Sequence, residues 1–199
     1  DEPLGRGWSI MDNWHRLLAA HEHVRNPGRS VMPDHKPVAA ILSCSDARVP
    51  PSVIFDQDAG ELFVVRVAGN IATSAAVASI DYAIDELNVR LVIVLGHTSC
   101  GAVGAACAGT TTSYLQPLIS QIAPLLGVGG CPGVDLLAER NVLASIQTLT
   151  TSTTPTGEAI RAGNVAVRGV IYEVDTDTLR TVHAPELTCL TNVSERDDL

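Results

Sequence analysis

The chain has 199 residues, of which 46% are hydrophobic and 18% charged, and we expect residues 1–199 to form one domain with a sizeable core. The formal net charge of −9 argues against nucleic acid or an anionic membrane surface as a partner, because both attract basic proteins. No apolar run approaches the roughly 18–20 residues of a membrane-spanning helix.

The N-terminal part predicts a helix. Residues 8–24 carry apolar side chains at helical spacing, and the sequence Asn-Pro-Gly at 26–28 ends the pattern. We interpret residues 1–35 as an N-terminal helical arm that precedes a core of residues 36–199. The arm either packs on a partner subunit or covers its own domain, and the pattern does not separate the two.

From residue 38 onward, strand and helix patterns alternate. The helix predicted over 73–88 has Ser74 or Thr73 as its N-cap. Continuous apolar strands that alternate with helices indicate a mainly parallel β-sheet flanked by helices, an α/β fold, and we expect an antiparallel strand at one edge. The predicted strands are 38–42, 61–67, 91–96 and 164–174.

The region after the third predicted strand is mostly helical. We expect helices over 112–149, interrupted by the Gly-rich sequence at 127–133. The Thr-rich sequence at 148–157 predicts a turn or a mobile loop.

Two polar motifs follow directly on predicted strands. Ser-Cys-Ser-Asp-Ala-Arg occupies 43–48, and Gly-His-Thr-Ser-Cys-Gly-Ala occupies 96–102. The carboxyl ends of parallel strands meet at one edge of the sheet, where ligands bind in such folds. We therefore expect both motifs to contribute to one site.

The motifs supply a set of metal-binding side chains. Cys44, His97 and Cys100 offer two thiolates and one imidazole, which suit a tetrahedral Zn²⁺ site with an open fourth position. A single buried Cys is usually inert, and a single His at a strand end is usually hydrogen-bonded. The grouping of all three with Asp46 and Arg48 favours a catalytic metal site.

Asp46 and Arg48 add a carboxylate and a guanidinium beside the predicted ligands. The carboxylate could bind the metal or accept a hydrogen bond from zinc-bound water, and Arg48 could hold it in place and keep it ionised. The alternative is a surface ion pair of little energetic value.

The other three cysteines, Cys107, Cys131 and Cys189, lack such neighbours, and we interpret them as non-ligands. Cys107 falls on the helix expected after Cys100, where packing is its expected role. An odd number of cysteines fits a disulfide framework poorly and is typical of a reducing compartment. We therefore expect a cytoplasmic protein.

The motifs together resemble those of β-class carbonic anhydrases. Cys-Ser-Asp-Ala-Arg (44–48) is similar to the family's C-x-D-x-R motif, and Gly-His-Thr-Ser-Cys-Gly-Ala (96–102) is similar to its H-x-x-C motif. The segments at 60–70 and 78–89 also look like the family's. The resemblance runs from about residue 35 to residue 107.

This resemblance implies a zinc lyase that interconverts CO₂ and bicarbonate through zinc-bound hydroxide, with one Zn²⁺ per subunit. It implies that Asp46 orients the hydroxide and that Arg48 anchors Asp46. Phe63 and Tyr82 match positions that line the CO₂ pocket, typically from the neighbouring subunit. The resemblance also implies a homodimer or a homotetramer.

Some positions depart from the family pattern. His35 stands where many members carry a substrate-binding Gln, so we include it among the pocket residues. Ile41 replaces the Trp of a regulatory bicarbonate site, whereas Arg66 and Tyr172 match the other two positions of that site. Bicarbonate regulation is therefore not expected.

Two other functions keep the same zinc site. One is hydrolysis of CS₂ or COS, and the other is a non-catalytic, zinc-stabilised or redox-sensing protein. The intact pair of Asp46 and Arg48 argues against the non-catalytic function, because a structural zinc site does not need it.

Overall fold

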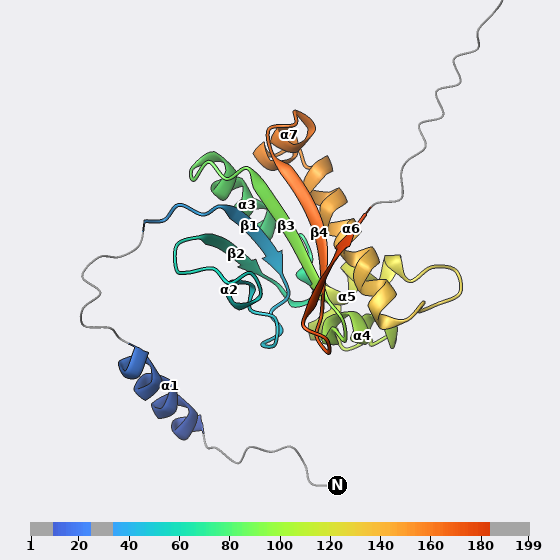
Figure 1. Cartoon of the computed structure of the whole chain (residues 1–199). Coiled ribbons are helices and arrows are strands. Elements are labelled where there is room, and N and C mark those ends of the chain that lie inside the picture. The colour runs from blue at the N-terminus through green and yellow to red at the C-terminus, as the bar shows by residue number, and fades with distance from the viewer. Residues whose placement is uncertain (1–9, 25–33, 184–199) are drawn as a thin grey trace, which may run out of the picture. The chain divides into compact units, whose positions relative to one another are not determined.

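The structure, a computed structural model of the chain, describes residues 10–24 and 34–183 (Figure 1). The chain divides into two units, residues 1–34 and 35–199. In the first unit, helix α1 spans Ile10–Val24 and confirms the predicted helix over that range. Its apolar side chains Trp14, Leu17 and Leu18 are exposed.

The second unit is built on a five-stranded sheet in the order β2-β1-β3-β4-β5. The first four strands are parallel, and β5 pairs antiparallel with β4 at one edge, as expected from the sequence. β2 and β3 lie on opposite sides of β1. The strand order therefore runs one way across the sheet from β1 to β2 and the other way from β1 through β3 to β5. The strands are β1 (Ala39–Ser43), β2 (Leu62–Arg66), β3 (Leu91–His97), β4 (Ala166–Glu173) and β5 (Thr178–Val182).

The two faces of the sheet bury alternate residues of the same strands. On β1, Ala40 and Leu42 join the larger core, whereas Ile41 joins a smaller core on the other face. Helices α3 (Ser74–Asp85), α4 (Gly101–Cys107) and α6 (Val134–Thr151) pack over the larger core. Ile54 of the short helix α2 (Pro51–Ile54) packs against both cores. The predicted α/β architecture with helices flanking the sheet is therefore confirmed (Figure 1).

The helix borders follow from local sequence. The side chain of Thr73 accepts a hydrogen bond from the Ala76 N–H and caps α3, which settles the choice between Thr73 and Ser74. Asn88 ends the following turn in a left-handed conformation with φ 57°. The helices of the second unit are α2 (Pro51–Ile54), α3 (Ser74–Asp85), α4 (Gly101–Cys107), α5 (Gln116–Ile122), α6 (Val134–Thr151) and α7 (Pro155–Arg161), with 3-10 turns η1 (Ala68–Asn70), η2 (Ser113–Leu115) and η3 (Ala123–Leu125).

The prediction of a loop over residues 148–157 is wrong for most of that range. Helix α6 continues to Thr151, and α7 begins at Pro155, so only three residues separate the two helices. The threonines near the end of α6 turn their hydroxyls onto carbonyl oxygens four residues earlier, as Thr150 does with Ile146. These bonds satisfy the hydroxyls within a helix, although Thr has a low helix propensity.

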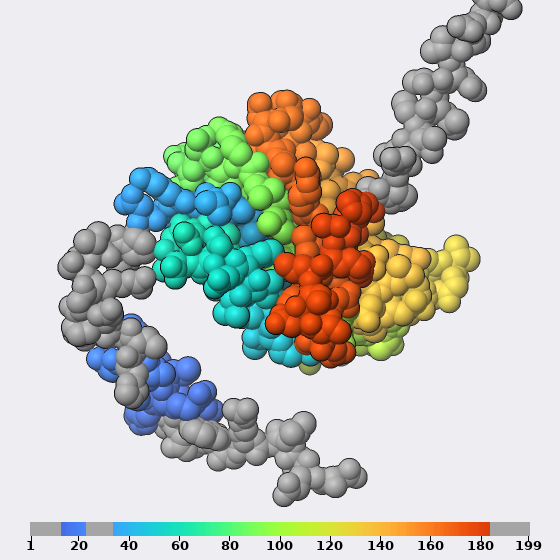
Figure 2. Space-filling view, in the orientation of Figure 1, coloured from blue at the N-terminus to red at the C-terminus, as the bar shows by residue number. Residues whose placement is uncertain are grey.

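No helix within the described residues is both long enough and apolar enough to cross a membrane. Figure 2 shows the segment near residue 130, in yellow, projecting from the surface of the second unit. Val128 in this segment is fully exposed.

Candidate metal centre

Three metal-binding side chains meet at the carboxyl edge of the sheet. The ligand atoms of Cys44, His97 and Cys100 all lie within 4.8 Å of one another, and all three residues are buried. The two sulfur atoms are 3.9 Å apart. The structure thus brings together the three residues that the sequence predicted as ligands.

The sheet topology explains why they meet. Cys44 follows the last residue of β1, and His97 is the last residue of the neighbouring parallel strand β3. Cys100 occupies the N-cap position of α4, so the chain turns back toward β1 within three residues. The strand order reverses between β1 and β3, and α/β sheets place their sites at the carboxyl ends of the strands at such a point.

The imidazole of His97 is oriented for a ligand. Its Nδ1 lies 2.9 Å from the carbonyl oxygen of Thr98, which requires Nδ1 to carry the proton. In the neutral ring Nε2 is then an acceptor, and it is buried with no hydrogen-bond partner within the described part of the chain. Buried nitrogens rarely lack a partner, so an acceptor facing two thiols indicates a position for a cation.

Cys44 is placed to be a thiolate. Its sulfur accepts backbone N–H groups from Gly69 at 3.2 Å and from Asp46 at 3.4 Å. The hydrogen bond with Cys100 is the largest cause that lowers the pKa of the Cys44 thiol, to about 4, and both N–H groups act in the same direction. The same contact with Cys44, together with burial, raises the pKa of Cys100. The pair thus readily releases one proton, and a cation at the site would favour release of the second.

Asp46 is held by Arg48 through both carboxylate oxygens. Arg48 Nε donates to Oδ1 at 3.0 Å and Nη2 donates to Oδ2 at 2.7 Å, while the Arg48 N–H also donates to Oδ1. These hydrogen bonds hold the pKa of Asp46 well below its usual range. Asp46 Oδ2 lies 4.0 Å from His97 Nε2, so the ionised carboxylate borders the metal-binding group while it is paired with Arg48.

Arg66 has a role in the structure that the sequence did not suggest. From β2, its guanidinium donates to the carbonyl oxygens of Cys44 at 2.8 Å and Asp46 at 2.5 Å, and to Val49 at 3.5 Å. It therefore holds the backbone of the first motif. The Tyr172 hydroxyl donates a hydrogen bond to Asp177 Oδ1.

The predicted pocket residues form a separate aromatic group. The rings of His35 and Phe63 stack with centroids 6.1 Å apart, and the centroids of Phe63 and Tyr82 are 6.0 Å apart. Phe63 pairs in register with Ala40, four residues before Cys44, which corresponds to about 13 Å along the strand. Within one chain, this group therefore does not line the Cys44 site.

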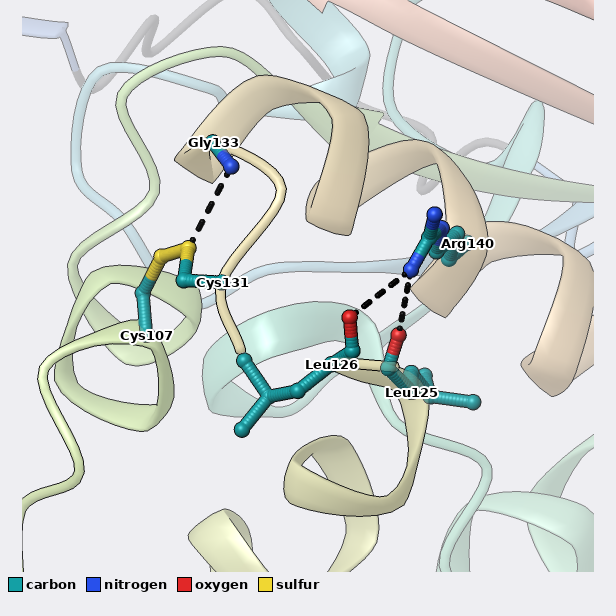
Figure 3. Close-up of a disulfide and its surroundings, with 6 residues drawn as sticks. All are labelled: Cys107, Leu125, Leu126, Cys131, Gly133 and Arg140. Atoms are coloured by element: carbon teal, nitrogen blue, oxygen red, sulfur yellow. Dashed lines mark hydrogen bonds between the residues drawn. A yellow bond between two sulfur atoms is a disulfide. The ribbon is translucent and has the colours of Figure 1, made fainter. Parts of the chain in front are cut away.

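The structure pairs Cys107 with Cys131 in a disulfide, which the sequence interpretation did not anticipate (Figure 3). Cys107 is the last residue of α4, and Cys131 lies in the loop before α6. Neither joins the group of ligand atoms, and Cys189 lies outside the described residues. The cytoplasmic location stays a prediction, and the disulfide removes the argument for a reducing compartment that supported it.

Asp135 is a further residue at the site that sequence reasoning missed. It lies in the first turn of α6, and its Oδ1 accepts the backbone N–H of Ser99 at 2.9 Å. An acidic residue at a helix start has a common local explanation in the helix dipole. Its contact with the second motif arises only from the packing of α6.

Comparisons with known proteins agree with the motifs and the fold. The family model for carbonic anhydrase matches residues 39–179. Carbonic anhydrase 2 of Mycobacterium tuberculosis is 41% identical over 189 residues, covering 87% of this chain and 89% of that protein. The solved β-carbonic anhydrase CcaA has a TM-score of 0.73 at 23% identity, covering 85% of this chain and 94% of its own.

A tetrameric β-carbonic anhydrase from Sordaria macrospora has a TM-score of 0.70 at 22% identity, and the match covers 87% of this chain and 94% of that one. Both solved structures share the fold, and the family model and the mycobacterial relative cover most of the sequence. The resemblance seen in the two motifs is thereby confirmed. The chain belongs to the β-class carbonic anhydrase family, whose members are enzymes.

Proposed function

We propose that the chain binds one Zn²⁺ per subunit through Cys44, His97 and Cys100 and catalyses the reversible hydration of CO₂ to bicarbonate and a proton. The observation that carries the proposal is the convergence of these three ligand atoms within 4.8 Å beside an ionised carboxylate. Asp46 and Arg48 are the proposed catalytic pair.

The residues fit zinc in chemistry and in spacing. Zinc bonds to sulfur of about 2.3 Å at a tetrahedral angle separate two thiolates by about 3.8 Å, close to the 3.9 Å between Cys44 and Cys100. The unpartnered Nε2 of His97 supplies a third donor. Three protein ligands leave a fourth position for a small molecule, which is typical of catalytic rather than structural zinc.

Zinc in such a site lowers the pKa of a water molecule to about 7 and so supplies a nucleophile at neutral pH. The ionised carboxylate of Asp46 can only accept hydrogen bonds. It therefore orients a donor O–H near His97 so that an oxygen lone pair faces the substrate. Arg48 keeps the carboxylate ionised, and its bidentate hydrogen bonds fix the plane of the carboxylate.

We also propose that the chain is a homodimer or homotetramer whose CO₂ pocket is completed across an interface. Phe63 pairs with Ala40, about 13 Å along the strand from Cys44, and the rings of His35 and Tyr82 lie beside Phe63. We therefore propose that this group serves the site of another copy. The tetrameric Sordaria macrospora enzyme supports this proposal by analogy of fold.

The test combines elemental analysis with stopped-flow CO₂ hydration. We expect one zinc per chain and hydration activity in the wild type, and loss of both in Cys44→Ser and His97→Ala. The matched control is the double variant Cys107→Ser and Cys131→Ser, which removes two sulfurs outside the site and should retain its zinc. A wild type with bound zinc and no hydration activity would overturn the proposed reaction, and retention of zinc by both ligand variants would overturn the proposed site.

A further inference from the structure

The turn between His97 and Cys100 adopts an unusual backbone conformation. Ser99 has φ 55°, in the left-handed region that costs a residue with a side chain roughly 1–2 kcal/mol. This turn sets the direction of Cys100 relative to His97, so the spacing of two proposed ligands depends on it. A neighbouring contact that favours this conformation would preserve the ligand geometry.

Asp135 supplies such a contact. Its Oδ1 accepts the Ser99 N–H at 2.9 Å, from a helix that follows the motif by more than 30 residues in sequence. Both residues are exposed, so water could replace the acceptor but could not fix its position.

Ser99 also connects this contact to the other motif. Its carbonyl oxygen accepts a hydrogen bond from Arg48 Nη2 at 3.2 Å. The same Nη2 donates to Asp46 Oδ2 at 2.7 Å. A continuous series of hydrogen bonds therefore runs from Asp135 through the Ser99 residue to Arg48 and Asp46.

The helix that carries Asp135 is fixed at several points. Asn141 donates to the carbonyl oxygen of Gly69, whose own N–H donates to Cys44, and Ser145 donates to the carbonyl oxygen of Asn70. At the start of α6, Arg140 donates to the carbonyl oxygens of Leu125 and Leu126, as Figure 3 shows. Asp135 thus acts from a rigid element.

We propose that Asp135 is a positioning residue of the active site. It fixes the Ser99 turn, and through that turn it sets the direction of Cys100 and the place of Arg48. The effect on zinc retention rests on the proposed zinc site, whereas the effect on the turn does not. We expect loss of the carboxylate acceptor to weaken zinc retention by about 10- to 100-fold, as for other groups that orient metal ligands.

The experiment compares Asp135→Leu, which has no acceptor, with Asp135→Asn, which keeps an acceptor oxygen but loses the charge. The first measurement is the rate of zinc transfer from the loaded protein to a coloured chelator. The Leu variant should release zinc at least about tenfold faster than the wild type, and the Asn variant should stay within about threefold. Glu139→Gln is the control, because Glu139 lies on the same helix and pairs with Arg180 instead.

The second measurement is amide hydrogen exchange of Ser99 in the metal-free protein. It should quicken in Asp135→Leu and remain near the wild-type rate in Asp135→Asn. Equal zinc release in the wild type and Asp135→Leu would overturn the proposal. Equally accelerated zinc release in the Leu and Asn variants would also overturn it, because the effect would then come from the charge at the start of α6.

Each possible failure has its own result. If the wild type bound no zinc, the proposed function would fall, and the exchange rate of Ser99 alone would then decide the role of Asp135. If Asp135→Leu did not fold, Asp135→Ser would replace it, because the shorter side chain cannot span the distance to Ser99. An unchanged exchange rate in the folded variant without the acceptor would overturn the proposal.

Discussion

Both carboxylate oxygens of Asp46 accept hydrogen bonds from Arg48, and acceptor capacity remains for one more donor. The guanidinium approaches both oxygens, and the backbone N–H of Arg48 adds a third donor to Oδ1. The carboxylate therefore keeps one orientation and one protonation state while it borders His97. In this arrangement Asp46 does not occupy the position of a fourth ligand, so that position is left to a small molecule.

Asp46→Asn should separate the charge of this residue from its shape. The amide NH₂ of Asn and the guanidinium of Arg48 are both donors, so the bidentate contact would be lost. We expect kcat for CO₂ hydration to fall by about 100-fold while zinc content stays at the wild-type level. Stopped-flow kinetics and metal analysis on one preparation check this. Wild-type kcat in the variant would remove Asp46 from the mechanism.

The low pKa of Asp46 predicts how the ion pair responds to acid. Because the folded-state pKa lies below the unfolded value of about 3.9, the pair stabilises the fold at higher pH and loses this contribution as the pH falls toward the folded-state pKa. Both groups are partly exposed, so water screens the pair and its contribution is small. Urea unfolding should show a constant difference between the wild type and Asp46→Asn from pH 5 to pH 8, and a smaller one below pH 4. A difference that grows on acidification would contradict this sign.

Residue types were enough to predict that Cys44, His97 and Cys100 form one group, but not which residues hold the backbone around them. Two Cys and one His at strand ends are rare enough in combination to indicate a site. Arg66 and Asp135 act through contacts with backbone atoms, and a backbone carbonyl or N–H leaves no signature in the sequence. Their roles depend on which elements pack against the two motifs, so they became visible only in the fold.

At the scale of elements, the close approach of β3 and α6 determines where His97 lies. Gly96 precedes His97, and a Cβ at this position would lie 2.5 Å from Val142 Cγ2 on α6 and 2.8 Å from Ile171 Cδ1 on β4. Neither neighbour belongs to a long, flexible side chain. The absence of a side chain at Gly96 therefore lets the end of β3 sit directly beneath α6.

Gly96→Ala should force β3 and α6 apart beside the metal site. We expect the free energy of unfolding to fall by about 1–3 kcal/mol and zinc release to quicken. Gly104→Ala is the matched control, because a Cβ on α4 meets no atom within 4 Å and Ala favours a helix by up to about 1 kcal/mol. Denaturant unfolding of both variants provides the measurement, and equal stability of the two would contradict the packing argument.

The disulfide between Cys107 and Cys131 encloses α5 in a loop of 24 residues. Closing a loop of this length in the unfolded chain stabilises a fold by about 3 kcal/mol, which corresponds to about 10 °C in Tm for a chain of this size. A phosphine reductant should therefore lower Tm by about that amount. The double variant Cys107→Ser and Cys131→Ser should show the lower Tm with and without reductant. A wild-type Tm that is insensitive to reductant would exclude a stabilising disulfide.

Elements with clear periodicity were predictable, and those defined by distant contacts were not. The strands and α3 were placed to within a few residues because their burial pattern is local. The Thr-rich end of α6 was mistaken for a loop because tertiary packing outweighs weak helix propensity: Leu149 is fully buried there. The disulfide was missed because the separation of two cysteines in sequence does not show their distance in the fold.

At the scale of the whole molecule, the aromatic group of His35, Phe63 and Tyr82 bears on assembly. Tyr82 is half exposed although its ring lies against Phe63. β2 is an edge strand, so this group lies at a margin of the sheet that another copy can reach. The two motifs predicted the group of metal-binding side chains, whereas the pocket shared between copies stays a prediction from the family resemblance.

Tyr82→Ala should therefore weaken self-association and raise KM for CO₂ together, if the pocket is shared between copies. Tyr114→Ala is the control, since Tyr114 is a more exposed tyrosine elsewhere on the surface. Sedimentation velocity over a range of protein concentrations, with kinetics on the same samples, tests the link. A monomeric wild type with full activity would contradict the shared pocket.

The placement of the two ligand-bearing strands has a consequence for how the enzyme acquires its metal. β1 and β3 are inner strands whose buried residues belong to the hydrophobic core, so we expect the core to hold the three donors in place whether or not a metal is bound. A zinc finger folds only when it is loaded, whereas this scaffold can be loaded after folding. With the proposed zinc site, we then expect the fraction of active molecules to follow the free zinc concentration around the protein, and folded molecules without zinc to become active once zinc is supplied.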